Sequence, residues 1–66
     1  MTEKQLKRLA REEYLDCREC GHYPEFITDG VELSTAEIKM YAADYNMTVT
    51  QFKQYKKYLE QLCFGD

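Results

Sequence analysis

The chain has 66 residues, a net charge of −3, one histidine, one proline and three cysteines, and 44% of its residues are hydrophobic. This composition is that of a globular protein rather than a disordered one. The length allows one domain, residues 1–66, which buries only about 60% of the surface that its unfolded chain exposes. We therefore expect a disulfide, a metal, a partner subunit or unusually good helix packing to stabilise it.

Three helix-start signals divide the chain and make the predicted fold class mostly α. In a capping box, a Ser or Thr side chain accepts a hydrogen bond from the N–H three residues later, and a Glu or Gln there reaches back to the cap. The pairs are Thr2 with Gln5, Ser34 with Glu37 and Thr48 with Gln51. Each cap also lies between two apolar residues that form a hydrophobic staple, namely Met1 with Leu6, Leu33 with Ile38 and Met47 with Phe52.

Hydrophobic spacing places the three helices at about residues 3–16, 35–45 and 49–62. Asn46 separates the last two, and Asn tolerates the left-handed conformation that ends a helix. Between the first two, Pro24 excludes a continuous helix. Asp29-Gly30 favours a hairpin turn between residues 26–28 and 31–33. We therefore predict a three-helix domain with a short loop or β-hairpin between its first and second helices.

The charge is unevenly distributed along the chain. Residues 1–11 carry a net charge of +3, residues 12–44 carry −7 and residues 45–66 carry +1. A polyphosphate would repel the acidic middle, so any contact with nucleic acid must come from the two ends.

Ala42, Asn46 and Phe52 have the spacing of a small residue, a turn residue and a buried apolar residue, with Met47 and Tyr55 at flanking apolar positions. In this respect Met40–Leu59 resembles the DNA-binding helix-turn-helix, although no particular family. Asn46 stands where that motif usually has Gly, and the replacement is tolerable because Asn residues can also adopt a positive φ.

The resemblance implies that the last helix enters the major groove of DNA, and one such helix reads so few base pairs that a homodimer is expected. Its exposed positions would contact the bases and the backbone: Val49, Thr50, Gln51, Lys53, Gln54 and Lys57. Basic residues of the first helix would contact phosphates: Lys4, Lys7, Arg8 and Arg11. However, two amphipathic helices joined by a turn also occur in domains that never bind DNA.

Cys17-Arg18-Glu19-Cys20-Gly21 resembles the knuckle of a zinc ribbon, in which two thiolates hold a tetrahedral zinc ion. The chain holds four Cys and His residues in all, so one zinc ion would take Cys17, Cys20, His22 and Cys63. The alternatives are that Cys63 is an ordinary buried side chain and that the paired cysteines are unliganded or form a labile disulfide. A redox role is less favoured, because the βαβ context of thioredoxin is missing.

The leading functional interpretation is a small DNA-binding or transcription-regulatory protein. The alternative is an acidic module that uses its six Tyr residues and the acidic middle segment to dock on a basic protein partner, by analogy with phage proteins that inhibit a host nucleic-acid enzyme. In that case we expect Tyr23, Phe26 or the acidic segment to matter for binding, rather than the lysines of the last helix. We expect no enzyme, because the chain lacks a nucleophile elbow and a phosphate-binding loop. No apolar run is long enough to cross a membrane and Met1–Arg11 lacks a signal-peptide core, so we expect the cytoplasm, or a host cytoplasm.

Overall fold

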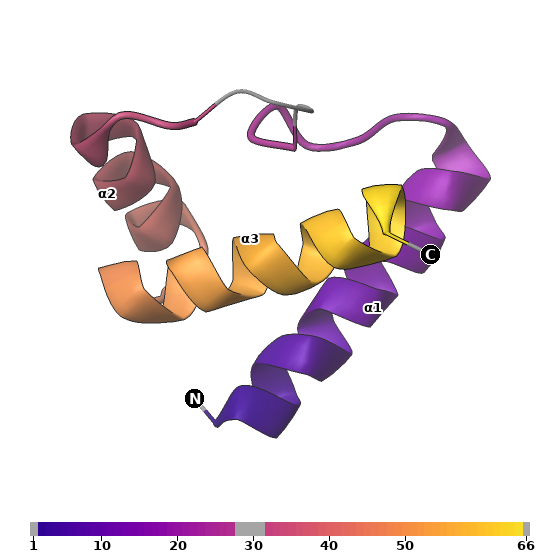
Figure 1. Cartoon of the computed structure of the whole chain (residues 1–66), viewed down its shortest axis with the longest axis horizontal. Coiled ribbons are helices and arrows are strands. Elements are labelled where there is room, and N and C mark those ends of the chain that lie inside the picture. The colour runs from indigo at the N-terminus through magenta and orange to yellow at the C-terminus, as the bar shows by residue number, and fades with distance from the viewer. Residues whose placement is uncertain (1, 28–31, 66) are drawn as a thin grey trace.

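Three helices make up the fold in the computed structural model, which describes residues 2–27 and 32–65 (Figure 1). They are α1 (Glu3–Cys20), α2 (Thr35–Asp44) and α3 (Val49–Phe64). The predicted mostly α, three-helix fold is therefore confirmed. α2 ends one residue earlier than predicted and α3 two residues later.

The first helix is four residues longer than predicted, and it includes the Cys-x-x-Cys segment. Cys17 continues the buried face of Leu6 and Ala10, so the apolar pattern extends beyond residue 16. The helix ends at Gly21, whose φ of 79° is left-handed and whose N–H donates to the Cys17 carbonyl at 2.7 Å. A glycine adopts this conformation without the steric cost of a Cβ, which is why the helix ends there.

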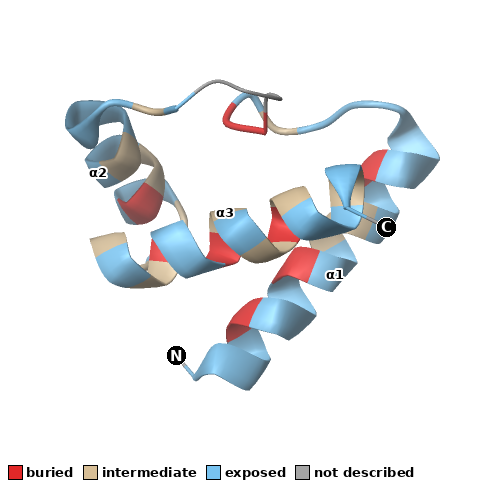
Figure 2. Ribbon diagram, in the orientation of Figure 1, coloured by how far each residue is buried: buried red, intermediate tan, exposed pale blue. Residues whose placement is uncertain are grey.

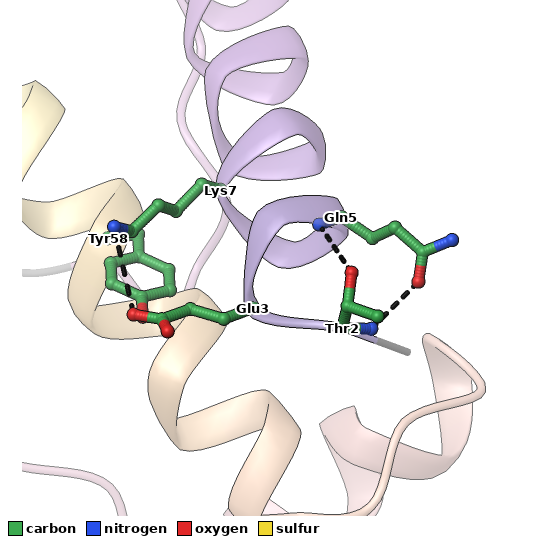
Figure 3. Close-up of polar contacts among 5 residues, drawn as sticks. All are labelled: Thr2, Glu3, Gln5, Lys7 and Tyr58. Carbon is green, nitrogen blue, oxygen red and sulfur yellow. Dashed lines mark hydrogen bonds and ion pairs between the residues drawn. The ribbon is translucent and has the colours of Figure 1, made fainter.

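The three predicted capping boxes are all present, with reciprocal hydrogen bonds of 2.7–3.2 Å. Figure 3 shows the first, in which Thr2 accepts from the Gln5 N–H and the Gln5 side chain accepts from the Thr2 N–H. The staple residues of the other two helices belong to the core or pack against it: Leu33, Ile38, Met47 and Phe52. The first staple includes Met1, which lies outside the described residues.

α3 is the central helix, since α1 packs across one part of it and α2 across another (Figure 1). Figure 2 marks in red the buried residues of all three helices. The core consists of Leu6, Ala10, Phe26, Ile27, Ala42, Phe52, Tyr55 and Leu59.

The connection between α1 and α2 contributes the centre of the core. Phe26 is 1% exposed, and its ring lies 5.1 Å from that of Phe52 and 5.2 Å from that of Tyr41, centroid to centroid. The Ile27 N–H donates to the Pro24 carbonyl at 2.9 Å, which makes a turn, and neither 21–27 nor 32–34 contains a strand. The predicted hairpin turn at Asp29-Gly30 lies outside the described residues.

Candidate nucleic-acid interface

The junction between α2 and α3 is a tight turn centred on Asn46. Its φ of 57° is left-handed, as predicted from its sequence position. The Asn46 N–H donates to the Ala43 carbonyl at 3.2 Å, and the Met47 N–H donates to the Ala42 carbonyl at 2.8 Å. These two bonds form a Schellman motif, which satisfies the last carbonyls of α2 and reverses the chain into α3.

Side chains at the positions of the helix-turn-helix resemblance pack between the two helices. Ala42 and Phe52 are buried, and Tyr55 is 4% exposed. Phe52 lies 5.9 Å from Tyr41 and 6.0 Å from Tyr45, ring centroid to ring centroid. α2 and α3 therefore pack against each other through these side chains, while the helix-turn-helix resemblance and DNA binding stay predictions.

The predicted DNA-contacting positions of α3 fall into two groups. Thr50, Lys53, Gln54 and Lys57 are exposed, whereas Val49 and Gln51 are partly buried. The Gln51 side-chain oxygen accepts a hydrogen bond from the Thr48 N–H at 2.9 Å, so this side chain takes part in the cap of its own helix.

A shallow groove beside α3 gathers three lysines. Its volume is about 410 Å³, and Lys53, Lys56 and Lys57 line it together with Glu32 and Glu60. Lys56 forms an ion pair with Glu60 one helical turn away. No carboxylate of residues 2–27 and 32–65 pairs with Lys53 or Lys57. The groove therefore carries a small positive charge on a face open to solvent.

Several basic side chains of α1 already have partners. Arg8 Nε lies 3.3 Å from Glu12 Oε1. Lys7 lies 3.7 Å from Glu3 and its Nζ is 5.3 Å from the Tyr58 ring centroid (Figure 3). The Tyr58 hydroxyl donates to the Glu3 carboxylate at 2.8 Å, which lowers the pKa of Glu3 and raises that of Tyr58. These contacts tie the start of α1 to α3.

Lys4 is exposed on the first turn of α1, and Arg11 borders a hollow beside Leu62 of α3. The basic residues predicted to contact phosphates thus all lie on α1, which packs against α3, the helix predicted to enter the major groove. Exposed Lys4 and Arg8 are accessible to a phosphate, although Arg8 would exchange its bond to Glu12 for it.

The predicted zinc ligands lie at different depths. Cys17 is buried and its Sγ lies 3.7 Å from Glu13 Oε1, whereas Cys20 and His22 are exposed and Cys63 is partly buried on α3. Burial, and next the nearby Glu13 carboxylate, raise the pKa of the Cys17 thiol to about 11. Within the described part of the chain, no three Cys, His, Asp or Glu side chains are grouped to hold a metal ion. Zinc binding stays a prediction.

One surface feature was missed by the sequence reasoning. Two adjoining hollows run along the exposed side of α1, the first lined by Gln5, Arg8, Leu9 and Glu12. The second, of about 480 Å³, is lined by Leu9, Glu12, Glu13 and Asp16, and its far wall is Tyr45, Met47 and Tyr55. Because Leu9 and Glu12 line both, we treat them as one surface, the α1 trough. Only packing could reveal it, since its far wall comes from the turn between α2 and α3 and from α3 itself.

Phe26, which the alternative interpretation expects to matter for binding, is buried, so its side chain cannot contact a partner directly in this structure. Tyr23 is exposed, as that interpretation requires.

Comparison with protein-family models, curated proteins and solved structures finds no match to this chain. Among the described residues, no helix combines the length and apolar character needed to span a bilayer.

Proposed function

We propose that the chain is a small regulatory protein that binds double-stranded DNA through the outer face of α3. The observation that carries this proposal is the exposed pair Lys53 and Lys57, which have no carboxylate partner in the described residues. Thr50 and Gln54 are exposed on the same helix. Lysines contact phosphates or guanine, and Gln and Thr contact base edges.

The distribution of acidic residues is compatible with this orientation despite the net charge of −3. Glu12, Glu13 and Asp16 line the α1 trough, whose wall includes Tyr55. At 3.6 residues per turn, Lys53 is about 160° around α3 from Tyr55. A duplex on the lysine face would therefore lie on the opposite flank of α3 from these three carboxylates, where their repulsion is weaker and partly screened by salt. Two other carboxylates, Glu32 and Glu60, border the lysines themselves, and Glu60 pairs with Lys56.

The capped turn supports the proposal by fixing how α3 is presented. The capping box at Thr48 and the Schellman motif at Asn46 fix the N-terminal end of α3 relative to α2. Residues at this end are the ones that read bases when a recognition helix enters the major groove.

The test is fluorescence anisotropy of the full chain with a labelled pool of random-sequence duplexes at low salt. The double variant Lys53→Glu/Lys57→Glu is expected to bind at least about tenfold more weakly, since it removes two phosphate contacts and adds repulsion. The slope of log affinity against log salt should fall by about 2, at about 0.9 per contact.

The matched control is Arg18→Glu/Lys39→Glu, which makes the same charge change at exposed positions of α1 and α2. It should weaken binding much less than the α3 variant. Equal losses for both variants would show that only net charge matters. A wild-type chain that binds no duplex would contradict the proposal and favour the alternative of a protein-binding module.

A further inference from the structure

One of the two hollows of the α1 trough, the hollow of about 480 Å³ that we call the acidic pocket, has carboxylates without a cation. They are Glu12, Glu13 and Asp16. Glu12 already pairs with Arg8 at 3.3 Å. Glu13 and Asp16 form no ion pair within the described part of the chain. The pocket therefore presents two negative charges that lack a positive partner.

A tyrosine hydroxyl in the wall of the acidic pocket also lacks a partner. Tyr55 is only 4% exposed, yet its hydroxyl makes no hydrogen bond to any described residue. The hydroxyl oxygen keeps contact with solvent, since no fully buried side-chain polar atom of residues 2–27 and 32–65 lacks a partner. Burial, and next the nearby Glu13 carboxylate, raise the pKa of Tyr55, so the hydroxyl keeps its proton. A nearly buried polar group is thus available to a ligand in the pocket.

The rest of the pocket wall is apolar or aromatic. Leu9 is 37% exposed, and Met47 lines the pocket on the opposite side. Tyr45 is partly buried, and its ring lies 5.6 Å from that of Tyr55, centroid to centroid. A long side chain with an apolar stem and a cationic end matches this surface, because the stem can pack on the apolar wall and the charge can reach the carboxylates and the tyrosine.

We infer that the acidic pocket is a docking site for an arginine side chain of a partner protein. The charge that the pocket lacks is positive, and its acceptors come from two helices, with Glu13 and Asp16 on α1 and Tyr55 on α3. No three Cys, His, Asp or Glu side chains of the described residues are grouped to hold a metal ion, so these carboxylates are too far apart to enclose a small ion.

Arginine fits this spacing better than lysine does. A guanidinium is planar and carries five N–H donors, so it can bond to several separated acceptors at once and also stack on an aromatic ring. A lysine ammonium is a compact point charge that reaches fewer of them. The Tyr55 hydroxyl would accept one of these bonds while Glu13 and Asp16 accept others.

This inference goes beyond DNA binding and uses other residues. Lys53 is about 160° around α3 from Tyr55, so a duplex and a protein partner would occupy opposite flanks of the same helix. Arginine binding is measured without DNA, and therefore either proposal can fail while the other stands.

The test is an NMR titration of the ¹⁵N-labelled full chain with the blocked peptide acetyl-Gly-Arg-Gly-amide. We expect saturable amide shifts around Glu13, Tyr45 and Tyr55. The lysine counterpart should bind several-fold more weakly, and the uncharged citrulline counterpart should not bind. A wild type without saturable shifts at about 10 mM peptide, where a site of about 1 mM affinity is roughly nine-tenths filled, would overturn the inference. Equally tight binding of the lysine peptide would overturn the assignment to arginine.

A charge variant tests whether the peptide binds in the acidic pocket. Glu13→Gln/Asp16→Asn should raise the dissociation constant of the arginine peptide about three- to tenfold, as expected for two partly exposed ion pairs. The matched control is Glu19→Gln/Glu25→Gln, which removes the same charge at exposed positions outside the pocket. The control should change the dissociation constant much less, and equal losses would show that only net charge matters and overturn the inference.

A hydroxyl variant tests the role of Tyr55. Tyr55→Phe should weaken binding about two- to fivefold, the loss expected for one hydrogen bond. It should unfold in urea at the same or a higher concentration than the wild type, because the hydroxyl that it removes has no partner in the fold. Tyr58→Phe, whose hydroxyl donates to Glu3 outside the pocket, should bind the peptide normally. A folded Tyr55→Phe that binds as tightly as the wild type would overturn the assignment of this hydroxyl to the site.

Discussion

Phe26 provides a direct test of what holds the three helices together. Its ring contacts Tyr41, Tyr45, Phe52 and Tyr55, with centroid separations of 5.1–6.4 Å to these rings and Phe52 the nearest. Burying an aromatic side chain removes about 150–250 Å² from water, worth roughly 4–6 kcal/mol at about 25 cal/mol per Å² as an upper bound. Truncations of buried Phe to Ala generally cost about 3–5 kcal/mol.

The expected loss is large relative to the whole stability of so short a chain. At roughly 0.05–0.15 kcal/mol per residue, 66 residues give a free energy of unfolding of about 3–10 kcal/mol. Phe26→Ala should therefore remove at least about a third of it and can leave the chain largely unfolded. Urea denaturation followed by far-ultraviolet circular dichroism measures this loss, and Phe26→Leu, which keeps much of the apolar volume, should show a smaller one.

The matched control is Tyr23→Ala, an aromatic truncation three residues earlier in the same connection. Tyr23 is 47% exposed, so its loss should change the free energy of unfolding by no more than about 0.5 kcal/mol. Equal effects of the two substitutions would refute the reasoning, because they would show that the connection does not contribute the centre of the core. A Phe26→Ala loss below about 1 kcal/mol would refute it as well.

Three further predictions concern the turn, a helix cap and a buried thiol. Asn46→Ala should cost about 1–2 kcal/mol in urea unfolding because φ is 57° there, whereas Asn46→Gly should be nearly neutral; equal costs would contradict a conformational origin. Ser34→Ala should cost about 1 kcal/mol through loss of the α2 cap, while Thr35→Ala at the exposed next position should cost much less. The folded-state pKa of Cys17, about 11, lies above its ordinary value of 9.0, so its stabilising contribution is complete below pH 9 and is lost as the pH rises toward 11. Unfolding measured across this window should show a smaller alkaline loss in Cys17→Ala than in the wild type, and an unchanged loss would contradict the shift.

The first residue of each helix could be predicted because the signals that cap a helix start are local. A capping box needs only two side chains three residues apart, and Ser34 with Glu37 forms its bonds whatever packs elsewhere. The left-handed Asn46 is local in the same way, since its cost depends on its own backbone. The predicted end of α1 lies four residues before the observed one. The sequence interpretation assigned Cys17 to a zinc site, whereas the structure makes it part of the buried face of the helix.

Tertiary structure alone decided which side chains share a surface. Phe26 looks like an available contact in the sequence, but packing against α2 and α3 buries it. The α1 trough joins Leu9 and Glu13 to Tyr45 and Tyr55, residues more than 30 positions apart, so no local pattern could show it. The sequence by itself determined where three helices begin and how α2 turns into α3, because these depend on bonds between near neighbours. How α1 crosses α3 depends on contacts between distant residues, and that crossing decided which charges lie together and which faces stay open.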